Sequence, residues 1–132
     1  MSARGPFPYL EQQENEQYRA PGCLVTVSYD RHTKPYPAII DSGAEYTSVP
    51  AEIADEFQLE QRGEMDVSGT TGPKEVQRVY EVNLEFLGLA FPVHPVLAGT
   101  GEITKEFVLI GRDILNRYRL VLDGPNFIFT IE

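Results

Sequence analysis

The sequence predicts a mainly β fold with two short helices, contained in one domain. Apolar and polar residues alternate over several short segments that are rich in β-branched and aromatic side chains. Gly, Pro, Asn and Asp separate these segments, as they do between strands. Only two stretches carry apolar residues at helical spacing, and a length of 132 residues corresponds to about one domain.

The first two strands are predicted at residues 24–29 and 36–40, around a turn at 30–35. The second strand is apolar and ends directly at Asp41. His32 lies in the turn, where we expect a solvated loop residue. Because His94 is the only other histidine, no histidine-rich metal cluster can form, and we expect no metal and no cofactor.

A short helix is predicted at residues 51–57, because Ile53, Ala54 and Phe57 share one face at helical spacing and Pro50 suits a first helical turn. Residues 65–84 then predict two strands around a Gly- and Thr-rich tip at 68–73. Such a tip suits a mobile hairpin, and an ordinary hairpin turn fits it as well.

The C-terminal third predicts further strands at 87–93, 96–97 and 107–110, with prolines limiting the pairing of the first two. A helix of one or two turns is predicted at 113–118. A hairpin follows, with strands at 120–122 and 127–131 around the turn at 123–126. Alternation in its last strand, with Phe127, Phe129 and Ile131 on one face, fits a core strand and a strand at an interface with a partner chain equally well.

Residues 1–21 are predicted to be a flexible N-terminal arm, and residues 22–132 to be the folded domain. Pro6 and Pro8 break the arm, and its centre is mostly Gln and Glu without apolar alternation. The alternative is a segment that crosses to a partner or occupies its own cleft.

Composition excludes several classes of function. A net charge of −9 and a pI near 4.7 argue against a nucleic-acid partner and against an anionic membrane surface. Cys23 is the only cysteine, so no intramolecular disulfide forms. There is no apolar run of transmembrane length and no signal-peptide pattern at the start, so a cytoplasmic location is expected.

The chemistry is predicted at residues 38–44, where Ala38, Ile39 and Ile40 lead into Asp41-Ser42-Gly43-Ala44. A buried strand of this kind delivers one carboxylate to a sharp turn at the end of a sheet. Glycine at the third position allows unusual dihedral angles or close approach, and the serine hydroxyl can tie the loop down. This stretch resembles the active-site loop of the aspartic proteases, Asp-Ser/Thr-Gly-Ala.

A second stretch, Val-Leu-Ile-Gly-Arg-Asp-Ile-Leu at 108–115, resembles the segment that crosses beneath this loop in retroviral-type (retropepsin-like) aspartic proteases. Both signatures occur once and in the right order. The resemblance covers about residues 23–132 and implies a closed, orthogonal β-barrel with two short helices and a flap hairpin. It also implies an aspartic endopeptidase, a hydrolase of peptide bonds.

The chain has one Asp-Ser/Thr-Gly, whereas a pepsin-like enzyme carries two. Peptide hydrolysis without a metal needs a base for water and an acid for the carbonyl or the leaving amine, and two close carboxylates that share one proton supply both. The resemblance therefore implies a homodimer in which the two Asp41 side chains meet on the two-fold axis.

The resemblance also assigns roles to the loop and its support. Ser42 would hydrogen-bond across the axis, Gly43 would offer its carbonyl to substrate, and Ala44 would lie against a pocket. Glu45 would pair with Arg112, while Gly111 would allow the chains to cross.

The polypeptide substrate is expected to lie extended between the barrel and the flap, pairing its backbone as an added strand. The expected lining residues are Ile39, Tyr46, Leu109, Ser68, Gly69, Thr70, Thr71 and Gly72. Tyr46 replaces a small acidic residue of some retroviral enzymes. The rival hypothesis is a catalytically silent module of the same fold that binds peptides or serves assembly, and an unrelated β-barrel with a chance triplet is disfavoured by the second signature.

Overall fold

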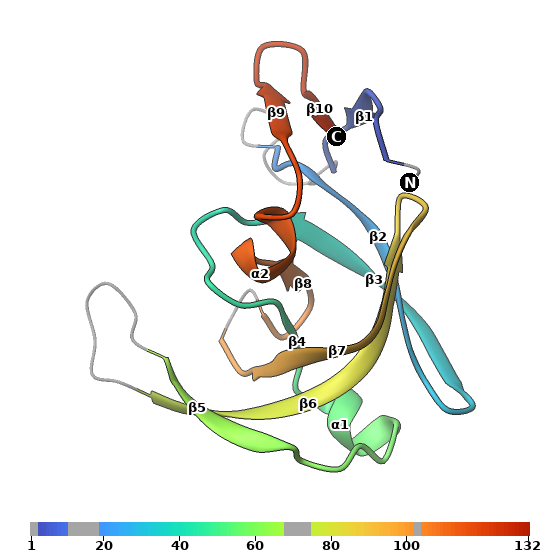
Figure 1. Cartoon of the computed structure of the whole chain (residues 1–132), viewed down its shortest axis with the longest axis vertical. Helices are drawn as coiled ribbons and strands as arrows, with labels where there is room; N and C mark the ends of the chain where they lie inside the picture. Colours follow the sequence, from blue (N-terminus) through green and yellow to red (C-terminus); the bar gives the residue numbers. More distant parts are fainter. Residues whose placement is uncertain (1–2, 11–18, 68–74, 102–103) are drawn as a thin grey trace.

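The computed structural model describes residues 3–10, 19–67, 75–101 and 104–132 (Figure 1). Strands predominate, and the two helices are short. In chain order the elements are β1 (Phe7–Pro8), β2 (Gly22–Tyr29), β3 (His32–Ile40), β4 (Ser48–Pro50), α1 (Glu52–Glu56), β5 (Gly63–Val67), β6 (Glu75–Phe86), β7 (Leu89–Gly99), β8 (Val108–Ile110), α2 (Arg112–Leu115), β9 (Leu120–Asp123) and β10 (Ile128–Ile131).

Six strands close into a barrel in the order β2-β3-β8-β4-β7-β6, because β6 also pairs with β2. The closing contact is antiparallel and sets Val27 opposite Leu84. β5 continues the sheet beyond β6 as an antiparallel hairpin, which extends away from the barrel (Figure 1). The predicted mainly β fold, its closed barrel and its two short helices are confirmed. The tip of the hairpin, including Ser68–Gly72, lies outside the described residues.

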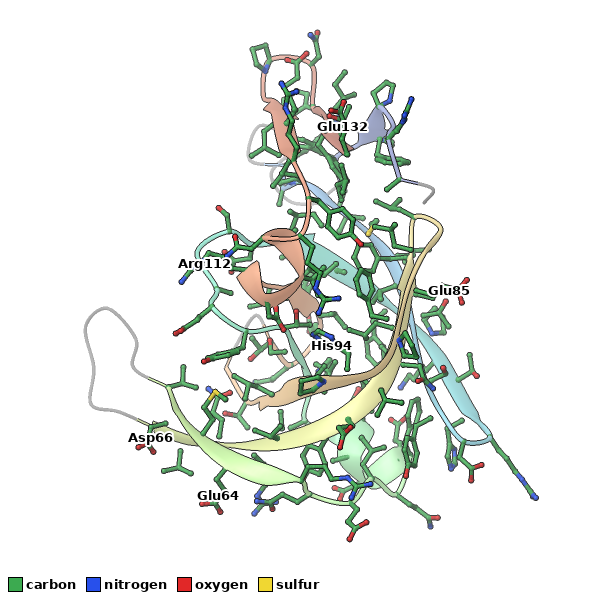
Figure 2. All side chains as sticks on the ribbon, viewed as in Figure 1. Glu64, Asp66, Glu85, His94, Arg112 and Glu132 are labelled. Carbon is green, nitrogen blue, oxygen red and sulfur yellow. The ribbon has the colours of Figure 1, made fainter. Side chains whose placement is uncertain are left out.

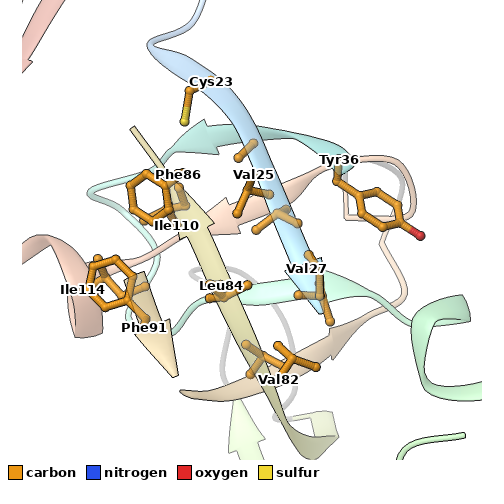
Figure 3. Close-up of a cluster of buried hydrophobic side chains, with 14 of the residues drawn as sticks. Cys23, Val25, Val27, Tyr36, Val82, Leu84, Phe86, Phe91, Ile110 and Ile114 are labelled. Atoms are coloured by element: carbon orange, nitrogen blue, oxygen red, sulfur yellow. The ribbon is translucent and has the colours of Figure 1, made fainter. Parts of the chain in front are cut away.

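Inward-facing side chains from every barrel strand fill the core (Figure 3). β2 buries Cys23, Val25 and Val27 and leaves Leu24 exposed, which is the period of two that the sequence predicts. Complete burial of such a side chain contributes about 1.5–3 kcal/mol. The largest fully buried side chains are Phe129, Ile53, Leu84, Ile110, Ile114, Ile131, Val25, Val27, Val49, Val82, Val96 and Val108.

The β6–β7 hairpin differs from the prediction at two places. Leu87 and Gly88 both have positive φ (51° and 79°) and form its turn, so the strand predicted from residue 87 begins at Leu89 instead. β7 is also one continuous strand through both prolines. β7 tolerates Pro92 because the β6–β7 pairing shifts its register opposite this proline, between Val82 and Leu84. At the same place the Val93 amide donates a hydrogen bond of 2.9 Å to the Asn83 side-chain oxygen.

β3 begins earlier than predicted, and the expectation for His32 is wrong. His32 is the first residue of β3, and its ring stacks on Phe57 at 5.2 Å between centroids. The stacking partner comes from the end of helix α1, so the contact depends on tertiary packing and has no local signal.

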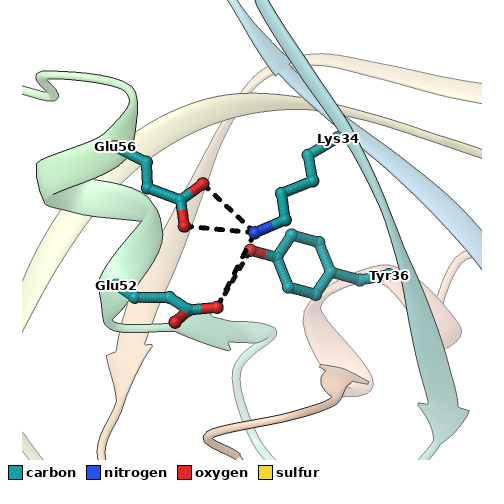
Figure 4. Close-up of polar contacts among 4 residues, drawn as sticks. All are labelled: Lys34, Tyr36, Glu52 and Glu56. Atoms are coloured by element: carbon teal, nitrogen blue, oxygen red, sulfur yellow. Dashed lines mark hydrogen bonds and ion pairs between the residues drawn. The ribbon is translucent and has the colours of Figure 1, made fainter.

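Helix α1 is confirmed as a short helix with Ile53 buried, although Pro50 belongs to β4 and not to its first turn. Polar contacts fasten α1 to β3 (Figure 4). Lys34 Nζ donates to both Glu56 carboxylate oxygens at 3.1 and 3.2 Å, and the Tyr36 hydroxyl donates to Glu52 at 3.3 Å.

A separate three-stranded sheet, β1-β10-β9, holds both ends of the described chain (Figure 1). The predicted β9–β10 hairpin forms, with Phe129 and Ile131 each 1% exposed, but Phe127 (φ 51°) belongs to its turn and not to the predicted last strand. Within the predicted arm, Phe7 pairs with Phe129 and Pro8 with Ile128, at the edge of a sheet where proline is tolerated. The described residues 3–10 therefore contact the body of the protein, and the domain boundary at residue 22 stays a prediction.

α2 is slightly shorter than the predicted 113–118 and begins at Arg112, after the extended Gly111. Neither helix in the described parts of the chain has the length and apolarity that a membrane crossing needs.

Candidate active site

The candidate site is the loop that follows β3. The end of β3 pairs in parallel with β8, which sets Ile40 opposite Ile110. The Asp41 amide then donates to the Ile110 carbonyl at 3.0 Å. Asp41 is therefore fixed at the common end of two parallel strands and is only partly buried.

The side-chain carboxylate of Asp41 closes the turn that follows this residue. The Gly43 amide donates to Asp41 Oδ1 at 2.9 Å, and the Ala44 amide donates to the Asp41 carbonyl at 3.1 Å. A Cβ atom on Gly43 would lie 3.1 Å from Asp41 Oδ1, which is tighter than most contacts of a Cβ. Glycine is favoured here by close approach and not by a left-handed φ. One carboxylate oxygen is thus oriented by the loop backbone.

The segment from Gly111 to Asp113 lies under this loop, and three of its N–H groups donate to loop carbonyls. The bonds run from Arg112 N to Ala44 O (2.8 Å), from Asp113 N to Glu45 O (3.2 Å) and from Arg112 Nη1 to Ser42 O (2.9 Å). The two sequence motifs, about 70 residues apart, therefore meet in space.

Gly111 allows the close crossing of these two segments. A Cβ atom at this position would lie 2.7 Å from the Tyr46 carbonyl carbon, 2.8 Å from its oxygen and 3.0 Å from the Ala44 oxygen. Because these are backbone atoms, any larger side chain would displace the loop that carries Asp41.

The expected ion pair between Glu45 and Arg112 does not occur. None of the ion pairs among the described residues joins these two side chains. The Arg112 guanidinium donates to the Ser42 carbonyl instead. Arg112, labelled beside α2 in Figure 2, still supports the loop, through a backbone acceptor and not through a carboxylate.

A buried polar network supports the end of the loop. Thr47 Oγ1 donates to Asp113 Oδ1 at 2.7 Å, and the Gly111 amide donates to the same hydroxyl at 3.1 Å. The other oxygen of Asp113 lies 2.9 Å from His94 Nε2, which Figure 2 places between α2 and β7. Burial opposes ionisation of Asp113, but hydrogen bonds to His94 and Thr47 outweigh it and hold the pKa of this carboxyl below its usual range.

Sequence reasoning missed Thr47 and His94 as parts of this network. Thr47 is fully buried and His94 is 6% exposed. In the structure Thr47 directly precedes β4 and His94 takes an inward position of β7, and nothing local in the sequence indicated that the two would share Asp113.

A cavity of about 590 Å³ opens beside the loop. Of the expected lining residues, Tyr46 and Leu109 line it, together with the loop residues Gly43, Ala44 and Glu45. Ile39 and Asp41 do not line it, and Ser68–Gly72 lie outside the described residues. The remaining lining residues are Ser48, Val67, Gln77, Leu97, Gly99, Thr100, Gly101, Thr104 and Arg112.

The described parts of the chain contain no group of three or more His, Cys, Asp or Glu side chains that could bind a metal ion. The arrangement instead places the Asp41 carboxylate on a loop held by backbone hydrogen bonds, next to a cavity that combines polar and apolar walls.

Comparisons with known proteins give three results. Residues 25–117, more than half of the chain, match the family described as "gag-polyprotein putative aspartyl protease". Comparison with curated proteins found no match. Among solved structures, a retropepsin-like aspartic protease from Rickettsia conorii superposes with a TM-score of 0.58 and 12% identity, over 99% of this chain and 93% of that chain.

A second solved structure is the retroviral protease-like domain of Ddi1 from Leishmania major. It aligns with a TM-score of 0.48 and 18% identity, over 84% of this chain and 88% of that one. At 12% sequence identity, the similarity to the Rickettsia protein shows the fold alone.

Proposed function

Because the chain belongs to the gag-polyprotein putative aspartyl protease family and has the retropepsin-like fold, we propose that it is an aspartic endopeptidase that acts as a homodimer. One observation carries the proposal. Asp41 stands at the end of two paired strands, on a loop fastened by the Gly111–Asp113 segment, beside a cavity of about 590 Å³.

The proposed reaction uses two Asp41 carboxyls, one from each protomer, which share a single proton. The ionised carboxyl takes a proton from water, whose oxygen attacks the peptide carbonyl carbon, while the protonated carboxyl donates to the carbonyl oxygen. A proton then passes to the amide nitrogen as the C–N bond breaks. Two carboxylates held close together share a proton because their repulsion prevents both from ionising, and the aspartic proteases are the standard example.

The second protomer is required because each chain supplies one such loop. In the single chain, Asp41 lies next to the cavity without forming its wall. A two-fold partner would bring a second loop against the first and extend the cavity over both carboxylates. A C2 interface fits this requirement, since it places the same residue of both copies on the axis.

The proposed substrate is an extended polypeptide that lies in this cavity. Gly43 to Tyr46, in the loop after Asp41, form one wall of the cavity. Val67 and Gln77, from the two strands of the β5–β6 hairpin, also line it. This hairpin would close over the substrate as a flap. Backbone pairing would supply affinity, and side chains would enter alternate pockets.

The test uses a peptide library incubated with the wild type and with Asp41→Asn, with and without a pepstatin-type inhibitor. The expected result is cleavage by the wild type at acidic to mildly acidic pH, inhibition by the inhibitor, and no cleavage by Asp41→Asn. Asp30→Asn is the matched control, because Asp30 is exposed in a turn at φ 53°, which asparagine tolerates.

Cleavage by a folded Asp41→Asn protein would refute the proposed chemistry. Peptide binding without cleavage by the wild type would favour the silent binding module.

A further inference from the structure

A cavity of about 410 Å³ lies between helix α1, β6 and the end of β7, and we call it the α1–β6 cavity. Figure 1 shows α1 beside β6. The volume falls in the range of about 300–1,000 Å³ that is typical of sites for small molecules. Three lining side chains, those of Ala51, Ala54 and Ala98, are only methyl groups and leave room for a ligand. Tyr46, which lines two other neighbouring cavities of about 590 and 240 Å³, does not line this one.

Strand β6 lies between the α1–β6 cavity and the larger cavity of about 590 Å³. Because side chains alternate along a strand, Val76, Arg78 and Tyr80 share one face of β6, and all three line the α1–β6 cavity. Gln77 of β6 and Thr100, which follows β7, line both cavities. Ligands in the two cavities would therefore contact the same strand.

β6 separates from β7 at the α1–β6 cavity. The two strands pair from Val79, opposite Leu97, onward, whereas residues 75–78 of β6 pair with β5. Ala98 of β7 pairs with β4 instead, opposite Val49. The cavity therefore lies where the β5–β6 hairpin leaves the barrel, at the base of the hairpin.

Helix α1 forms the fixed wall of this cavity. Ile53 on its inner side is fully buried, and side chains of β3 bind Glu52 and Glu56 at its two ends (Figure 4). The facing wall is the base of the hairpin, whose neighbouring strand is β5. A ligand that contacts both walls therefore ties the hairpin to the barrel.

Two charged side chains of opposite sign line the α1–β6 cavity, Asp55 of α1 and Arg78 of β6. Within the described parts of the chain, neither side chain has an ion-pair or hydrogen-bond partner. An anion alone would be repelled by Asp55, and a cation alone would be repelled by Arg78. A molecule that carries both charges can pair with both side chains.

The Tyr80 hydroxyl also has no hydrogen-bond partner among the described residues, although Tyr80 is only 6% exposed. A buried hydroxyl normally has such a partner. Gln77 and Thr100 add a side-chain amide and a second hydroxyl to the same cavity. These three groups suit the backbone amide of a peptide, which both donates and accepts hydrogen bonds.

We propose that the α1–β6 cavity is a regulatory site that binds a short peptide with free ends, and that the bound peptide slows cleavage. The ammonium group of the peptide pairs with Asp55, its carboxylate pairs with Arg78, and its apolar side chains lie against the alanines. The bound peptide holds the base of the β5–β6 hairpin against α1 and hinders the movement that admits substrate and releases product. Such peptides are products of an endopeptidase, so the effect on cleavage rests on the proposed function, whereas the binding does not.

The first experiment measures binding of the dipeptide Ala-Leu to the whole chain by NMR titration. N-acetyl-Ala-Leu lacks the ammonium group, Ala-Leu amide lacks the carboxylate, and the doubly capped dipeptide lacks both. Each cap should raise the Kd about 3-fold, the range for one solvent-exposed ion pair, and both caps together should raise it about 10-fold. Equal binding of the free and the doubly capped dipeptide, or no binding of Ala-Leu at about 10 mM, overturns the proposal.

Variants locate the bound dipeptide. Asp55→Asn and Arg78→Gln should each raise the Kd of Ala-Leu about 3-fold and remove the effect of the corresponding cap. Tyr80→Phe should raise it about 5-fold, because it removes one hydrogen bond with little change in shape. Asp66→Asn and Arg31→Gln are the matched controls, since these exposed residues line neither this cavity nor the larger one. Unchanged binding in the folded Asp55→Asn and Arg78→Gln proteins overturns the proposal.

The second experiment adds Ala-Leu at about ten times its Kd to a cleavage assay with one fluorogenic polypeptide. The kcat of the wild type should fall at least about 5-fold, the lower end of typical coupling between two sites, and excess substrate should not restore it. An unchanged kcat, or recovery at high substrate concentration, overturns the regulatory role. If the wild type cleaves nothing but binds Ala-Leu with the expected pattern of caps and variants, the site stands and the catalytic proposal fails.

Discussion

His94 Nε2 lies 2.9 Å from Asp113 Oδ2, although the two residues are 19 positions apart and come from β7 and the start of α2. The side chains are 7% and 19% exposed. Through its other oxygen, Asp113 accepts a hydrogen bond from Thr47, at the end of the loop that follows Asp41. A buried imidazole–carboxylate pair thus connects the β7 strand to the loop that carries Asp41.

His94→Ala is expected to lower the free energy of unfolding by about 1–3 kcal/mol, because it removes the hydrogen-bond partner of Asp113 Oδ2 in a partly buried site, while Oδ1 keeps its bond from Thr47. In an Asp113→Asn background the same change should cost at least 0.5 kcal/mol less. Urea unfolding of the four proteins measures this difference. His32→Ala is the control and should cost the same in both backgrounds, because His32 stacks on Phe57 and not on this network. Equal costs for His94→Ala would contradict the coupling.

The lowered pKa of Asp113 predicts that this carboxylate contributes to the free energy of unfolding at neutral pH and that the contribution is lost at acidic pH. The unfolded carboxyl has a pKa near 3.9, so between the folded and unfolded pKa values the unfolded chain binds more protons, and stability rises with pH. The contribution is complete above the unfolded pKa and is lost as pH falls through the folded pKa. The stability difference between wild type and Asp113→Asn should therefore shrink below about pH 4 in urea titrations. A difference independent of pH would refute this.

Gly111→Ala is expected to destabilise the protein by about 1–3 kcal/mol, because the new methyl group would lie within 3 Å of the Tyr46 backbone. Gly63→Ala is the matched control, since a Cβ there meets no atom within 4 Å, and its effect should stay within about 0.5 kcal/mol. Thermal and urea unfolding measure both. Equal effects of the two substitutions would show that the crossing at Gly111 is not tight.

Mixing wild type with Asp41→Asn tests the shared dyad. If protomers exchange, an equal amount of Asp41→Asn added at constant wild-type concentration should lower peptide cleavage to roughly half, because half of the wild-type protomers enter inactive mixed dimers. Added Asp30→Asn should raise total activity instead. Activity that is unaffected by excess Asp41→Asn would mean that one chain suffices for catalysis.

Cys23 should resist thiol reagents in the folded protein. Burial raises the pKa of its thiol to about 12, and the thiolate is the reactive form. Labelling by a chromogenic disulfide at pH 8 is expected to be slower than in urea by on the order of 100-fold or more. Similar rates in both states would show that β2 opens readily around this side chain.

The local patterns predicted much of the fold correctly. Period-two alternation located most strands, and the turn at 123–126 located the β9–β10 hairpin. The family resemblance of the Gly111 motif implied a close crossing, which the contacts with Tyr46 and Ala44 explain. These features depend on neighbouring residues or on a single backbone requirement, so the sequence carries their signal directly.

The predictions that were wrong concern residues whose environment is set by segments distant in the sequence. Pro92 and Pro95 discourage a strand locally, but pairing with β6 and a register shift keep β7 continuous. His32 looks like a turn residue until α1 brings Phe57 to its ring. Arg112 has an acidic neighbour in the loop at Glu45, yet the geometry of the loop presents the Ser42 carbonyl to it.

The amino-acid sequence by itself determined which carboxylate is presented, on which kind of loop, and that each chain carries only one such loop. The tertiary structure alone decided that the barrel closes through the pairing of β6 with β2, that His94 reaches Asp113, and that Tyr46 lines two neighbouring cavities. Strand periodicity and glycine requirements act over a few residues, whereas these contacts join segments whose meeting depends on how the whole core packs.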